Sequence, residues 1–192
     1  MKVLVVYAHP DPDSFNAAIH EQVCSELQQA GHEVHDLDLY REKFQASMSR
    51  EEREKYMTQE NVRGIENQVA RLRWADALVF VYPTWWMGPP AILKGWFDRV
   101  WLPGVAATFA NGVVEPGLTN IKKIMVITTQ GSSRWRMFAI GNPPKKMFKL
   151  SLKACTRCRD IQWLALYSMD KNTDLQRKHF LEKVRSRIKA IR

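Results

Sequence analysis

The 192-residue sequence has few cysteines, no long hydrophobic run and no acidic excess. Cys24, Cys155 and Cys158 are too few for a disulfide scaffold, which agrees with a reducing compartment. No apolar run approaches the roughly 20 residues that a membrane helix needs, and the apolar opening turns polar at His9 before any signal-peptide cleavage site. We therefore expect a cytoplasmic protein. With 45% hydrophobic and 26% charged residues, the composition predicts a single globular domain over residues 1–192 and excludes disorder, collagen and coiled coil.

The formal net charge of +9 is concentrated near the C-terminus. Residues 1–142 carry 15 basic and 16 acidic side chains, whereas residues 143–192 carry 14 and 4. Four apolar residues recur there at helical spacing, which favours a terminal helix with a solvated basic face: Phe180, Val184, Ile188 and Ile191. The alternatives are attraction to an anionic membrane surface, to nucleic acid or to a phosphorylated cofactor. No aromatic-rich nucleic-acid motif is present, so we expect no nucleic-acid partner.

Apolar, β-branched segments alternate with longer amphipathic ones, as in βαβ units around a parallel sheet that is buried on both faces. Strands are expected at 2–7, 33–39, 77–82, 122–129 and 160–167, and helices at 15–30, 61–74, 90–101, 145–154 and from 173 onward. A polar excursion at 41–60 and an irregular stretch at 102–120 separate some of them. The pattern predicts an α/β fold with one doubly wound, five-stranded parallel sheet and helices on both faces. The common strand order, 2-1-3-4-5, would place a ligand outside the carboxyl ends of the first, third and fourth strands.

The loop after the first strand has the features of a phosphate-binding site. It runs from Ala8 to Asn16 and opens directly onto a helix, whose first backbone N–H groups favour anions. Ser14 adds a hydroxyl and His9 a titratable ring. The loop has no glycine, so neither the dinucleotide fingerprint nor the P-loop applies. The alternative interpretation is a Ser or Asp N-cap with prolines that stiffen a turn.

Two adjacent tryptophans and a methionine lie in the loop after the third strand, Tyr82-Pro83-Thr84-Trp85-Trp86-Met87-Gly88-Pro89-Pro90. Neighbouring side chains point in different directions, so packing within a strand or helix does not explain both rings. A flat aromatic ligand would stack on them, with a gain of roughly 0.5–1.5 kcal/mol beyond burial. The alternative is a loop packed on its own domain or on a second subunit.

The loop after the fourth strand begins Thr128-Thr129-Gln130-Gly131 and offers hydroxyl groups beside a glycine that permits close backbone approach. A plain turn is the alternative interpretation. In the predicted topology this loop meets the other two at one edge of the sheet.

These segments resemble the flavodoxin-like NAD(P)H dehydrogenase (quinone) family, which includes animal quinone reductases and bacterial NAD(P)H oxidoreductases. The resemblance covers residues 2 to about 168. It is carried by His9 with Ser14-Phe15-Asn16, by the Tyr82 to Trp86 turn continuing into Pro90-Ala91-Ile92-Leu93-Lys94-Gly95-Trp96-Phe97-Asp98-Arg99-Val100, and by Thr128-Thr129 with Gly131. The long middle motif is specific, whereas the other two are weak alone.

The resemblance implies a flavin, FAD or FMN, held where the three loops meet. It assigns the flavin phosphate to His9, Ser14, Phe15 and Asn16. It assigns the isoalloxazine to the second loop, namely Pro83, Thr84, Trp85, Trp86 and Met87, and the polar edge of the ring to Thr128, Thr129 and Gly131. It further implies NADPH or NADH as hydride donor, a quinone-like acceptor, and a homodimer with the flavin at the subunit boundary.

Two positions depart from the family pattern. Where the animal enzymes have a Tyr and then a His that assist proton movement, this sequence has Trp135 and Arg136. We therefore assign no catalytic side chain and expect the flavin to carry the chemistry. Gln130 stands where many relatives have Gly, and we expect it to narrow that edge of the pocket.

The alternative function is a regulatory, ancillary flavoprotein subunit of a potassium efflux system, docked on a membrane protein through the basic C-terminal region. The Cys155-Thr156-Arg157-Cys158 segment has the spacing of redox and zinc sites, but it follows a predicted helix and has no second ligand pair. The sequence therefore predicts incidental cysteines there and no metal site.

Overall fold

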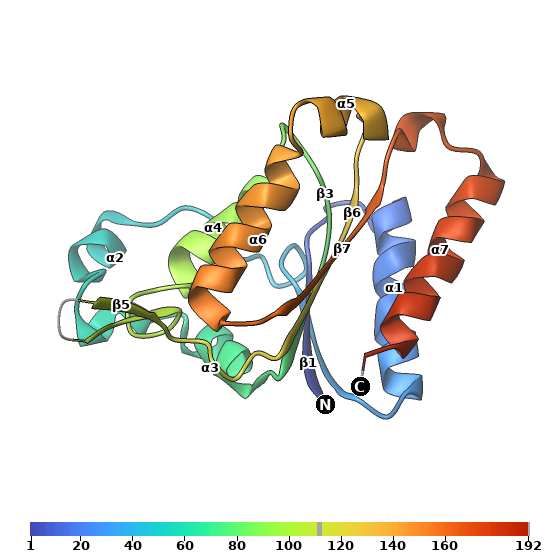
Figure 1. The fold of residues 1–192 in the computed structure, drawn as a ribbon. Coiled ribbons are helices and arrows are strands. Elements are labelled where there is room, and N and C mark those ends of the chain that lie inside the picture. The colour runs from blue at the N-terminus through green and yellow to red at the C-terminus, as the bar shows by residue number, and fades with distance from the viewer. Residues whose placement is uncertain (111–112, 192) are drawn as a thin grey trace.

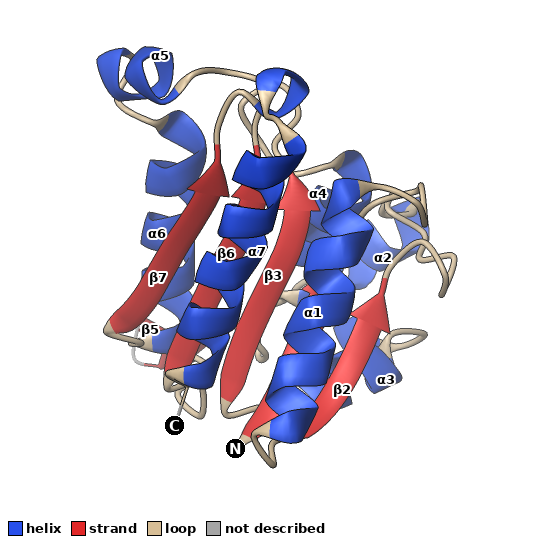
Figure 2. Ribbon diagram, turned by 90° about the vertical axis from the view of Figure 1, so that its right-hand side faces the viewer, coloured by secondary structure: helices blue, strands red, loops and turns tan. Residues whose placement is uncertain are grey.

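The computed structural model describes residues 1–110 and 113–191. Its central sheet has five parallel strands in the order β2-β1-β3-β6-β7, seen edge-on in Figure 1 and from one face in Figure 2. The strands are β1 (Lys2–Tyr7), β2 (Glu33–Asp38), β3 (Ala77–Pro83), β6 (Lys123–Thr129) and β7 (Asp160–Leu166). Counted along the chain within this sheet, the order is 2-1-3-4-5. The predicted fold class, strand directions and strand order are confirmed.

Helices cover both faces of the sheet (Figure 1). On one face lie α1 (Phe15–Gln29) and α7 (Asp174–Lys189), and on the other lie α3 (Glu66–Trp74), α4 (Ala91–Val100) and α6 (Pro143–Thr156). Successive strand residues point to opposite faces, so β1 supplies both cores. Val5 packs with Val23 in the core under α1 and α7, whereas Leu4 packs with Trp96 in the core on the other side.

The C-terminal helix α7 has the predicted amphipathic pattern. Phe180, Val184 and Ile188 are buried in the core that α7 shares with α1. Arg185 and Lys189, on the same helix, are about half exposed and pair with the buried carboxylate of Glu26 on α1, at 2.8 and 3.6 Å. The helix is therefore fixed to the domain by apolar packing and by ion pairs at its edge.

The prediction of one helix over residues 61–74 is wrong. A short 3-10 helix, η1 (Gln59–Val62), comes first, and α3 begins only at Glu66. Gly64, between them, has a φ of +84°, which interrupts a right-handed helix. The polar excursion at 41–60 also contains a helix, α2 (Arg50–Lys55), which begins with a capping box between Ser49 and Glu52.

The expectation of an irregular stretch over residues 102–120 is also wrong, because it contains the antiparallel pair β4 (Ala107–Ala110) and β5 (Val113–Pro116). These strands form a separate two-stranded sheet, so they leave the parallel order unchanged. A further short helix, α5 (Arg134–Ala139), lies in the predicted loop after β6 and is capped by Ser133. Among the described helices, none is long and apolar enough to cross a membrane.

Candidate active site

A cleft with a volume of about 780 Å³ lies at the carboxyl ends of the parallel strands. It is formed by the loops after β1, β3 and β6, as the topology predicts, together with a fourth segment after β7. Its lining residues are His9, Ser14, Phe15, Asn16, Pro83, Thr84, Trp85, Trp86, Thr129, Gly131, Met169 and Asp170. Ten of the twelve residues predicted from the sequence therefore line one cleft. Thr128 and Met87 do not.

Ser14 is the N-cap of α1, so the alternative interpretation of the first loop is also correct. The Ser14 Oγ accepts a hydrogen bond from the Ala17 N–H at 3.2 Å. The backbone N–H groups of Phe15 and Asn16 precede the first helical hydrogen bond and have no acceptor within α1. Capping and anion binding are compatible here, because the cap uses one N–H of the first turn and leaves others at the positive end of the helix dipole.

Asn16 connects the start of α1 to the end of β6. Its Nδ2 donates a hydrogen bond to the Thr129 Oγ1 at 2.9 Å, and the Asn16 side chain is buried. The other amide atom, Oδ1, is buried without a partner. A buried polar atom without a partner costs about 1–3 kcal/mol, which a hydrogen-bond donor such as a water molecule would offset.

Thr84 connects the second loop to the same strand end. Its backbone N–H donates to the Thr129 carbonyl at 2.8 Å, and its hydroxyl is hydrogen-bonded to that of Thr128 at 2.9 Å. Thr128 is fully buried, which explains why it positions Thr84 instead of facing the cleft.

The tryptophan loop is a tight turn from Trp85 to Gly88, closed by two backbone hydrogen bonds of 3.0 Å. Its central residues, Trp86 and Met87, have φ values of +47° and +61°. This left-handed conformation is unfavourable for bulky residues and costs about 1–3 kcal/mol per residue, and such strain is typical of functional sites. Trp86 is fully exposed, and Met87 is partly exposed and does not line the cleft.

His9 lies beside this turn, with its ring centroid 6.0 Å from that of Trp85. The His9 Nδ1 accepts a hydrogen bond from the Asp11 N–H at 3.1 Å. The same Nδ1 lies 3.2 Å from the Asp11 carbonyl oxygen, so Asp11 holds the ring through Nδ1, and Nε2 is the ring atom on the opposite side.

Sequence reasoning missed Met169 and Asp170, which lie in the 3-10 helix η2 (Met169–Lys171) after β7. Their position directly after the fifth strand was the available signal. Asp170 packs against Gly131, because a Cβ at Gly131 would lie 3.2 Å from the Asp170 Oδ2. Gln130, which was expected to narrow the pocket, is buried and does not line the cleft.

A second cleft of about 620 Å³ lies between α4 and α6, away from the strand ends. Aromatic and aliphatic side chains dominate its lining, among them Phe97, Trp101, Phe148 and Leu152. It contains none of the residues predicted to bind a ligand.

The family model for the flavodoxin-like fold matches residues 1–190. NAD(P)H dehydrogenase [quinone] 1 of Rattus norvegicus is 34% identical over 148 residues, covering 68% of this chain and 54% of the relative. An NAD(P)H:quinone oxidoreductase from Methanothermobacter marburgensis is 30% identical with a TM-score of 0.86, covering 100% of this chain and 99% of the other. Smu.1420 from Streptococcus mutans UA159 is 34% identical with a TM-score of 0.87, and the match covers both chains completely.

The chain spans 54% to 66% of the length of the curated relatives that it matches. The family model covers nearly all of the chain, and the solved structures match it from end to end. This chain belongs to the flavodoxin-like family that includes the NAD(P)H dehydrogenase (quinone) proteins.

Proposed function

We propose that the chain is a flavin-dependent oxidoreductase that transfers hydride from NADH or NADPH to a quinone-like acceptor. The observation that carries this proposal is the strand-end cleft, where the three loops of the family motif converge and Asn16 is hydrogen-bonded to Thr129. The names of the relatives, NAD(P)H dehydrogenase [quinone] and NAD(P)H:quinone oxidoreductase, support the same reaction.

The cleft residues fit a flavin, FMN or FAD. At the α1 end, the N–H groups of Phe15 and Asn16, the Ser14 hydroxyl and the His9 Nε2 would donate to the phosphate. The volume of about 780 Å³ falls in the range of cofactor pockets. At the other end, Pro83, Thr84 and the two tryptophans would lie against the isoalloxazine.

When bound, the flavin would accept hydride from the nicotinamide and pass it to the acceptor. The chain would supply binding and orientation. Thr84 and Thr129, fixed to each other through a backbone hydrogen bond, would hold the polar edge of the ring in position. The Trp85–Gly88 turn would cover one side of the cleft and exclude water from it. We assign no side chain of the cleft as a proton donor, and the proton that completes reduction of a quinone would come from water.

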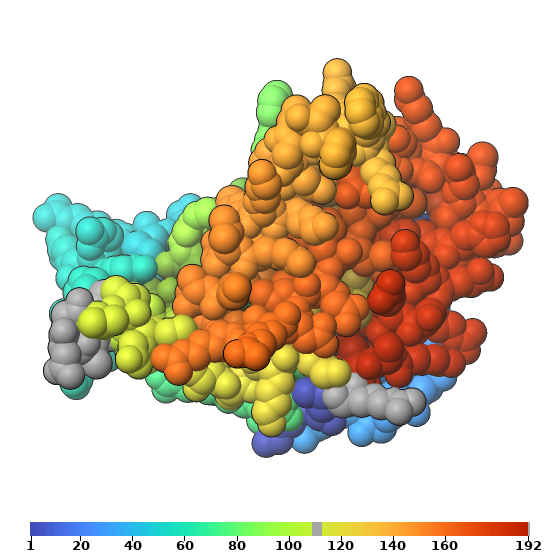
Figure 3. Space-filling view, viewed as in Figure 1, coloured from blue at the N-terminus to red at the C-terminus, as the bar shows by residue number. Residues whose placement is uncertain are grey.

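We include a homodimer in the proposal because apolar side chains are exposed along α5 and α6. Trp135, Phe138 and Leu150 are 74%, 71% and 70% exposed. These helices form one continuous surface in the space-filling view, with the turn between β3 and α4 at the same end of the molecule (Figure 3). An apolar patch of this kind is typical of a protein interface, and a second copy placed there would cover the exposed Trp86.

The alternative, a regulatory subunit of a potassium efflux system, stays a prediction. None of the relatives described above carries such a name. The basic face of α7 is exposed and would serve a membrane-protein partner, but a solvated helix face explains it equally well. Cytoplasmic localisation likewise remains a proposal.

The experiment is an anaerobic assay of the purified protein reconstituted with FMN and, separately, with FAD. We expect NADH or NADPH to bleach the flavin absorbance, and a simple quinone to restore it. Protein without flavin should not oxidise the nucleotide in the presence of the quinone, and oxidation on adding flavin would identify the flavin as the electron carrier. A flavin-loaded protein that neither nucleotide reduces would contradict the proposal.

A further inference from the structure

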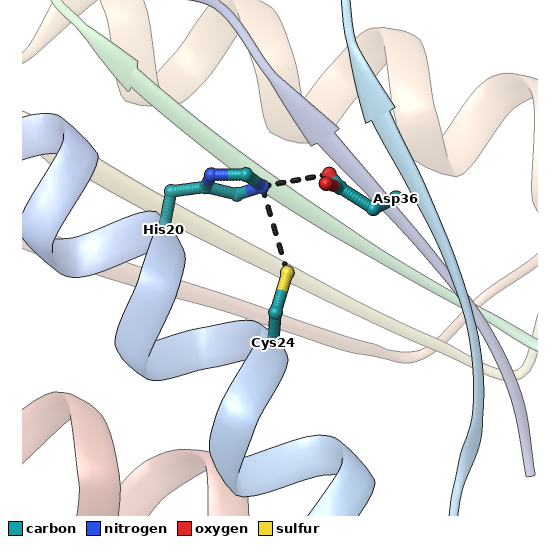
Figure 4. Close-up of side chains that lie close together, drawn as sticks. All are labelled: His20, Cys24 and Asp36. Atoms are coloured by element: carbon teal, nitrogen blue, oxygen red, sulfur yellow. Dashed lines mark hydrogen bonds and ion pairs between the residues drawn. The ribbon is translucent and has the colours of Figure 1, made fainter. Parts of the chain in front are cut away.

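Three side chains of the types that bind metals meet on the α1 and β2 side of the sheet, outside the strand-end cleft (Figure 4). The His20 Nε2 lies 2.7 Å from the Asp36 Oδ1 and 3.5 Å from the Cys24 Sγ. One candidate ligand atom from each residue lies within 4.8 Å of the other two. The proposed redox function uses none of the three.

Secondary structure brings these residues together. His20 and Cys24 are four residues apart on α1, so they lie on the same face, one turn apart. Asp36 projects toward them from β2, the edge strand beside β1. The ring of Tyr7 stacks on the His20 imidazole, with centroids 4.2 Å apart and an angle of 4° between the planes. The His20 ring is therefore held in place, and only 13% of its side chain is exposed.

The separation of the His20 and Cys24 ligand atoms is close to that in a tetrahedral zinc site. Zinc lies about 2.0–2.1 Å from a histidine nitrogen and about 2.3 Å from a thiolate, which places these two ligand atoms roughly 3.6 Å apart. The observed Sγ to Nε2 distance is 3.5 Å. The His20 to Asp36 contact is shorter, because it is a hydrogen bond, and it would lengthen by about 0.6 Å around a cation.

We propose that His20, Cys24 and Asp36 form a binding site for a borderline divalent cation of the zinc type, with water as the fourth ligand. A nitrogen, a thiolate sulfur and a carboxylate oxygen form the mixed donor set that such ions accept, whereas Mg²⁺ and Ca²⁺ require oxygen ligands. The sequence predicted no metal site because only the Cys155 and Cys158 pair has recognisable spacing. The three proposed ligands lie on α1 and β2, and their spacing in the sequence does not show that these two elements pack side by side.

One positively charged side chain lies beside this cluster. Arg41 pairs with the second carboxylate oxygen of Asp36 at 3.0 Å, and its side chain is 61% exposed. Burial, together with the negative charge of Asp36, raises the pKa of the Cys24 thiol to about 12. A bound cation would replace the thiol proton and compete with Arg41 for Asp36. Removal of the Arg41 guanidinium is therefore expected to tighten metal binding.

The test is a titration of the full-length, chelator-treated protein with Co²⁺, followed by Zn²⁺. Cobalt bound to a thiolate gives a sulfur-to-metal charge-transfer band, which reports directly on cysteine ligation. We expect one Co²⁺ per chain, displacement by Zn²⁺, and loss of the band in Cys24→Ser. His20→Gln and Asp36→Asn are each expected to weaken binding by at least about 10- to 100-fold. Loss of a group that only hydrogen-bonds to a metal ligand already costs about that much, and these two residues would be direct ligands. Arg41→Ala is expected to strengthen it.

Cys155→Ser is the matched control, because it removes a half-buried thiol elsewhere and should leave the band unchanged. Cobalt bound instead between the N-terminal amine and His32, whose nitrogen atoms lie 3.1 Å apart, would give no such band, because neither group contains sulfur. Circular dichroism of each variant checks the fold, and Asp36→Asn tests the site independently if Cys24→Ser proves unstable. Absence of a charge-transfer band, or a band that survives Cys24→Ser, would overturn the proposal.

Discussion

Asn16 and Thr129 are 113 positions apart in the chain, yet the Asn16 Nδ2 donates to the Thr129 Oγ1 at 2.9 Å inside the protein. This hydrogen bond joins the first turn of α1 to the carboxyl end of β6. It therefore fixes the proposed phosphate end of the cleft to the edge that would face the flavin ring. Both residues belong to short motifs that are weak separately, and their contact is what makes them one site.

Replacing Asn16 by Leu is expected to weaken flavin binding by up to about 10-fold, the equivalent of a neutral hydrogen bond of about 0.5–1.5 kcal/mol, because the backbone N–H of residue 16 is kept. The Asn16 Oδ1, which has no partner in the protein, is lost along with the Nδ2 donor. Thr129→Val removes only the acceptor and should affect binding less. Fluorescence titration with FMN and FAD measures both variants, and equal effects would contradict a direct role for Asn16.

The same pair allows a double-mutant cycle on stability. Each single variant should lower the free energy of unfolding by about 1–3 kcal/mol, because it leaves a buried partner unsatisfied. The double variant should lose less than the sum of the two. Urea denaturation of the four proteins gives the coupling energy, and strict additivity would show that the hydrogen bond does not stabilise the fold.

Trp86→Gly separates backbone strain from ligand binding. Trp86 has a φ of +47°, which glycine adopts without strain, and its ring is fully exposed. We expect thermal stability to be unchanged or slightly raised, because glycine relieves the strained φ but has more freedom in the unfolded chain. We also expect a clear loss of flavin affinity or of the proposed second subunit, because the indole is removed. If flavin content and oligomeric state both match those of the unchanged protein, Trp86 has no role in the site.

The exposed face of α5 and α6 predicts how the proposed dimer can be broken. Phe138→Glu places a charge where 71% of an apolar ring is exposed, and it should convert the dimer to a monomer in light-scattering chromatography. Leu175→Glu is the matched control on α7, where 62% of the side chain is exposed. A monomeric starting protein, or dissociation only in Leu175→Glu, would contradict the proposed interface.

Gly95→Ala tests a close approach between α4 and the chain after β2. Helix propensity alone predicts a gain of about 1 kcal/mol for this change. A Cβ at Gly95 would, however, lie 2.2 Å from the Ala46 carbonyl oxygen. We therefore expect a loss of about 1–3 kcal/mol in chemical denaturation, as for other overpacked sites. A stabilised variant would show that this contact is looser than described.

The ion pair between Glu52 and Arg99 predicts a pH dependence of stability. Burial raises the pKa of the Glu52 carboxyl, but hydrogen bonds from Ser49 and Arg99 outweigh it and hold the pKa below its usual value. The resulting stabilisation is present above the unfolded pKa of about 4.3 and is lost as the pH falls through the lower folded pKa. Glu52→Gln should therefore cost about 1 kcal/mol at pH 7.

That cost should disappear in acid, once Glu52 is protonated in the unchanged protein. Thermal melts between pH 2 and pH 7 measure the difference. Glu54→Gln is the control on the same helix, since the exposed pair of Glu54 with Arg50 is expected to contribute little. A difference between Glu52→Gln and the unchanged protein that stays constant across this range would contradict the predicted linkage.

The sequence predicted the parallel sheet because the periodicity of its strands is local and strong, as in the wholly buried β3. It also predicted that three loops would converge, because strand order follows from general topology. Short elements were missed: α5 has six residues, and its stability depends on the Ser133 cap more than on periodicity. Gly64 is the sequence signal that separates η1 from α3, because glycine favours the positive φ that ends a helix.

Contacts between distant side chains could not be predicted. Nothing in the spacing of Asn16 and Thr129, or of His20 and Asp36, shows that they are hydrogen-bonded, because each pair depends on the register of packed elements. The burial of Thr128 and Gln130 depends in the same way on which side of β6 each residue faces. A single sequence does not specify that register to one residue.

Flavin binding by the purified chain tests the central claim most directly. Titration with FMN and with FAD, followed by flavin fluorescence and absorbance, should saturate at one flavin per chain for at least one of them. The account predicts that the same titration on Asn16→Leu shows weaker binding while circular dichroism stays unchanged. A folded protein that binds neither flavin would contradict the account.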